Sequence, residues 1–140
     1  DKILLVKHRK TGRFMSCGGH AEENELLHET LMREINEELN LKVEFMQNNY
    51  FCNLTGELPL PFVVSYKIDK KLNERMQIFE FLCMTDDISK LKVNQKEIIE
   101  TKLFYKDEIK DSKLLTPSLK EIVLKAFEYT ENLNKFKMNP

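Results

Sequence analysis

The sequence predicts a fold of the α/β or α+β class, in which helices pack against a mixed β-sheet. Three observations support this prediction: β-rich runs separated by polar turns, an apolar stripe of helical period within residues 25–39, and a second such stripe after a proline near the C-terminus. The 140 residues suffice for one domain, which we place at residues 1–131, and we expect a polar tail at residues 132–140 to fray.

The composition argues against several classes of protein. A hydrophobic content of 41% is typical of soluble globular chains, and a net charge of −1 gives no reason to expect a nucleic acid or a membrane as partner. Cys17, Cys52 and Cys83 are odd in number and widely spaced, which favours reduced thiols in a cytoplasmic protein over a disulfide framework or a zinc site. No apolar run has the length of a membrane span, and no signal peptide is recognisable.

The first predicted element is a strand of aliphatic residues at 3–6. The chain opens almost inside this strand and without an initiator methionine, so we expect further residues upstream. The basic segment at 7–13 then turns, and its cations either form a solvated hairpin loop or meet a substrate phosphate. A helix should follow over residues 25–39, with Asn24 as N-cap and Glu25 in the first turn, where the helix dipole favours an acid.

The middle of the chain predicts strands and loops. Residues 42–47 indicate the start of a strand, and residues 48–61 are predicted as a loop because asparagine, glycine and proline recur in them. Residues 62–68 and 76–84 are rich in β-branched and aromatic side chains. The polar segment 69–75 joins them into a predicted antiparallel hairpin.

The last elements are a short strand and a helix. Residues 101–105 predict the strand, and Thr116 and Pro117 predict the start of the helix, because threonine is a good N-cap and proline fits the first helical position. Apolar residues at helical spacing continue this helix, which we expect to pack on the sheet: Leu119, Ile122, Val123, Ala126 and Phe127.

Three glutamates crowd one turn of the first helix. Glu34, Glu37 and Glu38 follow Arg33 directly, and like charges three or four residues apart on a helix repel each other. At about 100° per residue, Glu38 projects into the apolar stripe. Arg33 can pair with Glu29 or Glu37 at i±4 spacing, but one arginine cannot neutralise all the acids. A divalent cation such as magnesium would turn this repulsion into coordination.

Residues 19–41 resemble the Nudix box, G-x5-E-x7-R-E-U-x-E-E-x-G-U, in which U is a bulky aliphatic residue. Eight of the nine fixed positions match: Gly19, Glu25, Arg33, Glu34, Ile35, Glu37, Glu38 and Leu41. Asn40 stands where the pattern has glycine, and asparagine is the next best residue for the left-handed conformation that we expect there. Cys17 is a second departure, because relatives commonly carry proline before the paired glycines.

The resemblance implies a three-layer α/β/α arrangement and a hydrolase that cleaves the diphosphate linkage of a nucleoside diphosphate derivative. It also implies Mg²⁺ or Mn²⁺ as cofactor. By resemblance, Glu34 and Glu38 would bind the metal, and Glu37 would be a further ligand or a catalytic acid beside it. Arg33 would hold the carboxylates in place. Glu25 would brace the arginine, which is a structural role.

Further residues around the box are candidates for substrate contact or proton transfer. Gly18 and Gly19 would permit a backbone kink close to the helix, and His20 either contacts the substrate or packs the loop. A glutamate must accept a proton from the attacking water. This base is an acid of the box, or else Glu97 or Glu100. The alternative interpretation of Glu97 and of Glu100 is an acid in a loop that only contacts water.

Two other functions stay open at this point. A catalytically silent Nudix-fold module would bind a nucleotide-like ligand without turnover, although such a module is expected to lack acids of the box. A structural or interaction protein would merely expose the acidic helix to water, and the apolar direction of Glu38 argues against that. The identity of the substrate and the oligomeric state, including a homodimer, are also open, because specificity in such folds lies in loops outside the box.

Overall fold

The computed structural model describes residues 1–46, 49–52, 56–69 and 73–138 of the chain. The chain divides into two compact units. Asp1–Cys17 together with Lys92–Pro140 form the first unit, and Gly18–Leu91 form the second. Among the described helices, none combines the length and the apolar character that crossing a membrane requires.

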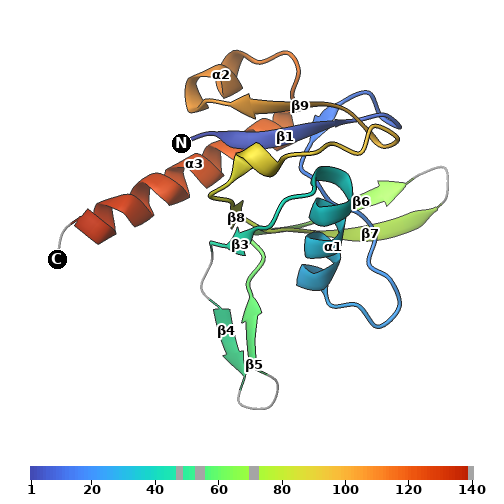
Figure 1. Ribbon diagram of the computed structural model, residues 1–140, viewed down its shortest axis with the longest axis horizontal. Helices are drawn as coiled ribbons and strands as arrows, with labels where there is room; N and C mark the ends of the chain where they lie inside the picture. The colour runs from blue at the N-terminus through green and yellow to red at the C-terminus, as the bar shows by residue number, and fades with distance from the viewer. Residues whose placement is uncertain (47–48, 53–55, 70–72, 139–140) are drawn as a thin grey trace. The chain divides into compact units, whose positions relative to one another are not determined.

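The first unit is built on a three-stranded antiparallel sheet of β1 (Ile3–His8), β2 (Phe14–Met15) and β9 (Ile98–Phe104). The strand order is β2-β1-β9, and Figure 1 shows β9 beside β1. The hairpin between β1 and β2 turns where Gly12 has a φ of +64°, a left-handed conformation that glycine adopts without steric penalty. The predicted first strand and the turn after it are therefore confirmed, although the strand runs on to His8.

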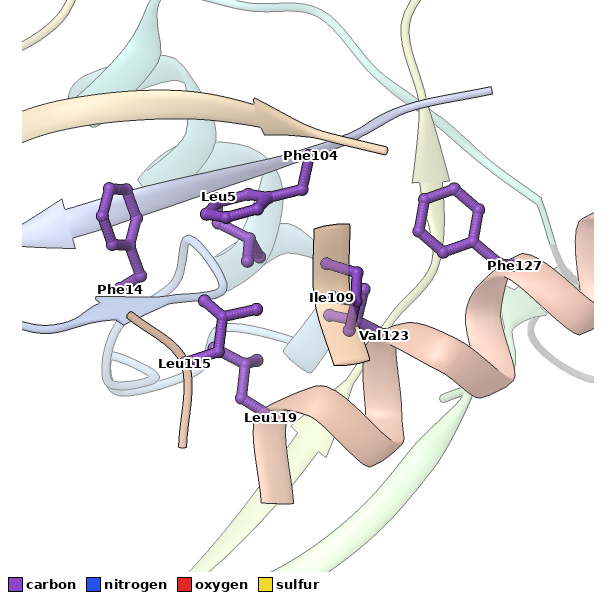
Figure 2. Close-up of a cluster of buried hydrophobic side chains, with 8 residues drawn as sticks. All are labelled: Leu5, Phe14, Phe104, Ile109, Leu115, Leu119, Val123 and Phe127. Carbon is purple, nitrogen blue, oxygen red and sulfur yellow. The ribbon is translucent and has the colours of Figure 1, made fainter. Parts of the chain in front are cut away.

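Two helices, α2 (Lys106–Asp111) and α3 (Pro117–Met138), supply the other side of the core of this unit. Figure 2 shows the cluster of buried side chains that the strands and helices share. It consists of Leu5, Phe14, Phe104, Ile109, Leu115, Leu119, Val123 and Phe127. The rings of Phe14 and Phe104 meet edge to face, with centroids 5.5 Å apart. Full burial of each large apolar side chain contributes roughly 1.5–3 kcal/mol, so this cluster is the main source of stability for the unit.

Helix α3 begins where the sequence predicts. The hydroxyl of Thr116 accepts a hydrogen bond from the backbone N–H of Leu119 at 3.3 Å, and Pro117 is the first helical residue. The expectation that the end of the chain frays stays a prediction, but residues 132–138 are helical, since α3 continues to Met138. The physical reason is local, because no glycine or proline interrupts the helical hydrogen bonds before Pro140.

The second unit contains helix α1 (Leu27–Leu39), the short 3-10 helix η1 (Ile88–Lys90) and pairs of antiparallel strands (Figure 1). The pairs in its described residues are β3 (Glu44–Phe45) with β8 (Cys83–Met84), β4 (Asn49–Cys52) with β5 (Gly56–Pro59), and β6 (Val63–Asp69) with β7 (Glu74–Glu80). The predicted hairpin at 62–84 is confirmed as β6–β7. Residues 70–72 of its turn lie outside the described part of the chain.

The start of α1 differs from the prediction. The N-cap position belongs to Leu26, and Asn24 takes a left-handed conformation with φ of 65° instead of capping the helix. Glu29 accepts a hydrogen bond from the backbone N–H of Leu26 at 2.9 Å. An acid in the first turn thus gives the N–H of the N-cap residue a hydrogen-bond partner, as in a capping box. Glu25 consequently lies before the helix and not in its first turn.

Two further segments of the second unit differ from the prediction. The strand expected at residues 42–47 is limited to Glu44–Phe45. The loop expected at residues 48–61 contains the hairpin β4–β5, because cross-strand pairing outweighs the turn residues in its sequence. Residues 47–48 and 53–55 of these segments lie outside the described part of the chain.

The predicted fold class is confirmed as a mixed α+β fold with helices and antiparallel sheets. Each strand pairing among the described residues is antiparallel. The finer arrangement, with one mixed sheet sandwiched between α1 and α3, stays a prediction.

Helix α1 ends as the sequence predicts. Asn40 has φ of 54° and ψ of 35°, which is the left-handed conformation, and its backbone N–H donates to the carbonyl of Asn36 at 2.9 Å. Its side-chain Nδ2 also donates to the carbonyl of Lys90 at 3.3 Å. Asparagine thus adopts the conformation that glycine would supply and adds a bond between the end of α1 and the end of η1.

We expect Asn40→Gly to unfold at nearly the same denaturant concentration as the wild type, and Asn40→Val to unfold at a lower one. Glycine reaches positive φ without penalty, whereas a β-branched side chain resists it at a cost of about 1–2 kcal/mol. Both variants lose the bond to Lys90, so the difference between their midpoints isolates the backbone effect. Equal midpoints would show that the left-handed turn does not limit stability.

Candidate active site

Arg33 is the centre of a charged network in the second unit. It lies in the middle of α1, and its Nε donates to Oε1 of Glu25 at 2.8 Å while its Nη2 donates to Oε2 of the same carboxylate at 3.0 Å. A bidentate pair of this kind fixes the orientation of both groups as well as their distance. Because Glu25 precedes the helix, the pair ties the incoming loop to α1.

Glu25 accepts two further hydrogen bonds through Oε2. The donors are the backbone N–H of Glu22 at 3.1 Å and the hydroxyl of Thr30 at 2.9 Å. Thr30 is buried in α1, so its hydroxyl depends on protein partners and not on water. The Arg33 guanidinium, followed by the backbone and hydroxyl donors, lowers the pKa of Glu25 from 4.5 to about 2. The predicted contact between Glu25 and the arginine is therefore present.

Glu34 is held between Arg33 and Gly19. The Nη1 of Arg33 donates to Oε1 of Glu34 at 3.0 Å. The Glu34 carboxylate also lies against Gly19 so closely that a Cβ at that position would overlap it. Gly19 is thus required for space, since no side chain fits beside the carboxylate. Gly18 has room for a side chain, since a Cβ there would lie 4.0 Å from the side chain of Leu31. Its backbone conformation, with a φ of +155°, is what favours glycine at this position.

The two remaining acids of the box differ in exposure. Glu37 is half exposed, and its Oε2 lies 3.5 Å from Nη1 of Arg33, which confirms the predicted i,i+4 pair. Glu38 is only 1% exposed, which confirms its predicted direction into the apolar side of the helix. The alternative pair, Arg33 with Glu29, is wrong, because the Glu29 carboxylate accepts a hydrogen bond from the backbone N–H of Leu26 at the start of α1.

The acids of this network outnumber its one cation. Glu25, Glu34 and Glu37 pair with a single guanidinium, that of Arg33. Its pKa rises above its usual value mainly through its hydrogen bonds with Glu25. Within the described residues, Oε2 of Glu34 accepts no hydrogen bond. Carboxylate oxygens are the ligands that Mg²⁺ and Mn²⁺ prefer, so the donor set of the box fits a divalent cation.

His20 takes part in the network through its backbone. Its carbonyl accepts a hydrogen bond from Nη2 of Arg33 at 3.2 Å, and its side chain is exposed. The arginine therefore fixes the loop at two points, Glu25 and His20. A contact between the His20 imidazole and a substrate stays a prediction.

Glu97 and Glu100 belong to the first unit, where both are exposed. Glu97 precedes β9, and its Oε1 accepts a hydrogen bond from Nδ2 of Asn94 at 3.2 Å. Glu100 is part of β9 and not of a loop. It pairs with Lys7 on β1, whose Nζ lies 3.8 Å from its carboxylate. Their candidacy as general base stays a prediction.

Two members of the network are not apparent from the motif. Thr30 is three residues before Arg33, so it shares a helix face with the arginine, and this spacing would identify it once Glu25 is known to fold back onto α1. Glu22 contributes a backbone N–H, which any residue type could supply. Its role depends on the path of the loop and leaves no signal in the sequence.

Comparisons with known proteins agree with this geometry. A family model described as NUDIX domain matches residues 1–126. A NUDIX-family hydrolase from Clostridium perfringens has a TM-score of 0.80 and 23% identity, over 93% of this chain and 90% of that one. A MutT NUDIX hydrolase from Burkholderia pseudomallei has a TM-score of 0.57 and 19% identity, over 86% and 84%.

A third solved structure, a UDP-X diphosphatase, has a TM-score of 0.54 and 20% identity, and the match covers 92% of this chain and 58% of that one. No curated protein sequence matches this chain. At these levels of identity the structural matches establish a shared fold, and they carry no information about substrate.

Glu25 should make the stability of the protein depend on pH between 4.5 and about 2. In the folded protein its carboxylate stays ionised down to a pKa of about 2, whereas the unfolded chain takes up the proton near 4.5. Its contribution is therefore complete above the higher value and is lost as the pH falls through the lower one. We expect Glu25→Gln to lower the free energy of unfolding at neutral pH and to flatten its pH dependence in this window, as measured by denaturant titrations at a series of pH values.

Two variants of Thr30 provide the control for this prediction. Thr30→Val keeps the volume but removes a donor to Glu25, so the loss of stability should begin at a higher pH than in the wild type. Thr30→Ser keeps the donor and should retain the wild-type profile. A wild-type profile for Thr30→Val would mean that the hydroxyl does not hold the carboxylate.

Gly19→Ala should destabilise the protein by about 1–3 kcal/mol, because the added methyl group would overlap the Glu34 carboxylate. In a Glu34→Ala background the same change should cost much less, since the overlapping group is gone. The coupling is measured as a double-mutant cycle of unfolding free energies. Additive losses would indicate that Gly19 acts through its backbone conformation instead.

Proposed function

The chain belongs to the Nudix family, because the NUDIX domain match spans residues 1–126, and we propose that it is a metal-dependent hydrolase that cleaves the diphosphate linkage of a nucleoside diphosphate derivative. One observation carries this proposal. A single guanidinium, that of Arg33, holds Glu25 in a bidentate pair and also bonds Glu34, which leaves the helix with an excess of carboxylates at the spacing of the box.

The acids of α1 would hold the cofactor. Glu34 and Glu38 lie one helical turn apart and would supply carboxylate oxygens to Mg²⁺ or Mn²⁺, with Glu37 as a further ligand. When bound, such a cation supplies Lewis-acid polarisation of a phosphoryl oxygen and lowers the pKa of the attacking water. The position of Glu38 supports its assignment as a ligand, because it follows Glu34 by one helical turn and so lies on the same side of α1.

Arg33 would act as the positioning residue of the site. Its bonds to Glu25 and Glu34 orient the Glu34 carboxylate against Gly19 before any ligand arrives. Charges that are positioned in advance stabilise a transition state without reorganising during the reaction. The loop formed by Gly18, Gly19 and His20 would then contact the substrate beside the carboxylates.

A glutamate would accept the proton of the attacking water. Glu37 is half exposed and lies on the same helix as the proposed ligands, which supports it as one candidate. Glu97 and Glu100 of the first unit are the other candidates, and both are exposed acids. Water attack at phosphorus would yield two phosphorylated products.

A panel of nucleotides tests the proposal. Nucleoside diphosphate sugars, dinucleoside polyphosphates and nucleoside triphosphates are incubated with the protein and Mg²⁺ or Mn²⁺ in ¹⁸O-water, and the products are identified by mass spectrometry. Two phosphorylated products, one of them carrying ¹⁸O, support hydrolysis at phosphorus. A nucleotide that raises the melting temperature but is not consumed would identify the silent binding module instead.

We expect Glu38→Gln to lose activity by more than the roughly 10–100-fold that is typical when an outer-shell partner of a metal is removed. The change removes a charge and keeps the volume, so the circular dichroism spectrum should be unaltered. Glu34→Gln should be similarly severe. Glu128→Gln, an exposed acid on α3, is the matched control and should retain activity. Activity of Glu38→Gln within a few-fold of the wild type, at unchanged metal affinity, would remove Glu38 from the site.

Magnesium should raise the melting temperature of the protein. A ligand that binds only the native state stabilises it by mass action, by about 2.7 kcal/mol at a concentration 100 times its dissociation constant. Thermal scans in EDTA and in millimolar magnesium measure the shift, which should shrink in Glu34→Gln and in Glu38→Gln. The absence of a shift in the wild type would mean that protein partners already neutralise the acids.

A further inference from the structure

The hairpin β6–β7 carries an apolar stripe on one face. Val64, Tyr66 and Ile68 alternate along β6, so their side chains lie on the same face of the ribbon. They are 56%, 74% and 51% exposed, respectively, which is unusual for three large apolar residues in a row. Phe79 of β7 pairs with Val64 and extends the stripe across the ribbon.

The outer edge of β6 lacks the features that usually block strand addition. Within the described residues β6 pairs with β7 and with no other strand, so its other edge presents unpaired backbone groups. The register with β7 runs from Val63 to Asp69 without a bulge, and β6 contains no proline. Its one lysine, Lys67, alternates onto the face opposite the stripe. Two-stranded ribbons are marginally stable in water and gain stability from a third strand.

We propose that β6 pairs with β6 of a second copy of this chain, antiparallel and across a two-fold axis at Tyr66. The two β6–β7 ribbons would then form one four-stranded sheet with a continuous apolar stripe. A closed two-fold interface uses the same surface on both copies, so the strand must complement itself. This proposal goes beyond the hydrolase activity and does not rest on it.

The sequence of β6 meets the requirement for self-complementarity. With the axis at Tyr66, the two tyrosines face each other, and Val64 of each copy faces Ile68 of the other. These are aromatic and β-branched cross-strand pairs, which stabilise sheets. Lys67 falls opposite Ser65, and Asp69 falls opposite Val63, so no like charges are paired along the strand.

The opposite edge of the ribbon is less suitable for the same pairing. Strand β7 centred on Gln77 would place Glu74 of each copy opposite Glu80 of the other. Like charges directly opposite each other destabilise a sheet, and the symmetry would repeat the repulsion twice. The charge pattern therefore favours β6 as the edge that pairs.

Sedimentation velocity over a wide range of protein concentration tests the interface. The wild type should approach twice the mass of one chain as concentration rises. Val64→Lys/Ile68→Lys places lysines opposite each other at both symmetric positions and should keep the mass of one chain throughout. Val64→Lys/Ile68→Glu places opposite charges at the same positions and should restore the dimer. Circular dichroism checks that each variant is folded.

A cross-linking experiment tests the position of the axis. Cα atoms of directly opposed residues in antiparallel strands are about 4.5–5.5 Å apart, which a disulfide can span. Tyr66→Cys should therefore form a disulfide between copies on mild oxidation, and peptide mapping should locate it at residue 66 in both. Ile88→Cys, at another exposed apolar position of the second unit, is the control and should cross-link much less.

Three results would overturn the proposal. They are a wild type with the mass of one chain at every concentration, a lysine double variant that associates like the wild type, and equal cross-linking through residues 66 and 88. Rescue by the lysine–glutamate variant is the result that a general hydrophobic association cannot produce.

Discussion

The bidentate pair between Glu25 and Arg33 is the interaction on which the arrangement of the box depends. It joins a residue before α1 to a residue in the middle of that helix, so it fixes where the loop returns to the helix surface. The same guanidinium then reaches Glu34 and the carbonyl of His20. Moving either partner of the pair would therefore displace the carboxylate that lies against Gly19.

This pair separates the acids of the box by role. The Glu25 carboxylate accepts hydrogen bonds from an arginine, a hydroxyl and a backbone N–H, so its oxygens are already bonded within the protein. These bonds lower its pKa, and it remains ionised into the acid range. Glu34 and Glu37 of α1 share the remaining nitrogen, Nη1, of the same guanidinium. A helix that crowds carboxylates in this way gives up stability, and coordination of a cation would restore it. Under the proposed function, this turn of α1 gives up stability in exchange for metal binding.

Features that depend on neighbouring residues could be predicted from the sequence, and those that depend on tertiary contacts could not. The left-handed Asn40, the pair of Arg33 with Glu37 and the start of α3 at Pro117 follow from conformational preference and helical spacing. The start of α1 does not, because Glu25 is drawn to Arg33 and Glu29 takes over at the helix start. Hairpin β4–β5 depends on pairing between strands, which composition alone does not reveal.

The two units bury apolar side chains to different extents, and this difference explains why the second unit relies on polar contacts. The first unit has a cluster of large buried residues from strands and helices (Figure 2). Among the described residues of the second unit, the buried apolar side chains are Ile35, Leu39 and Leu41. Such a core contributes little free energy of unfolding through apolar burial. The hydrogen bonds and ion pairs around Arg33 therefore contribute more to the structure of this unit. A unit of this kind gains most from partners that bind its native state, whether a cation at α1 or a strand at β6.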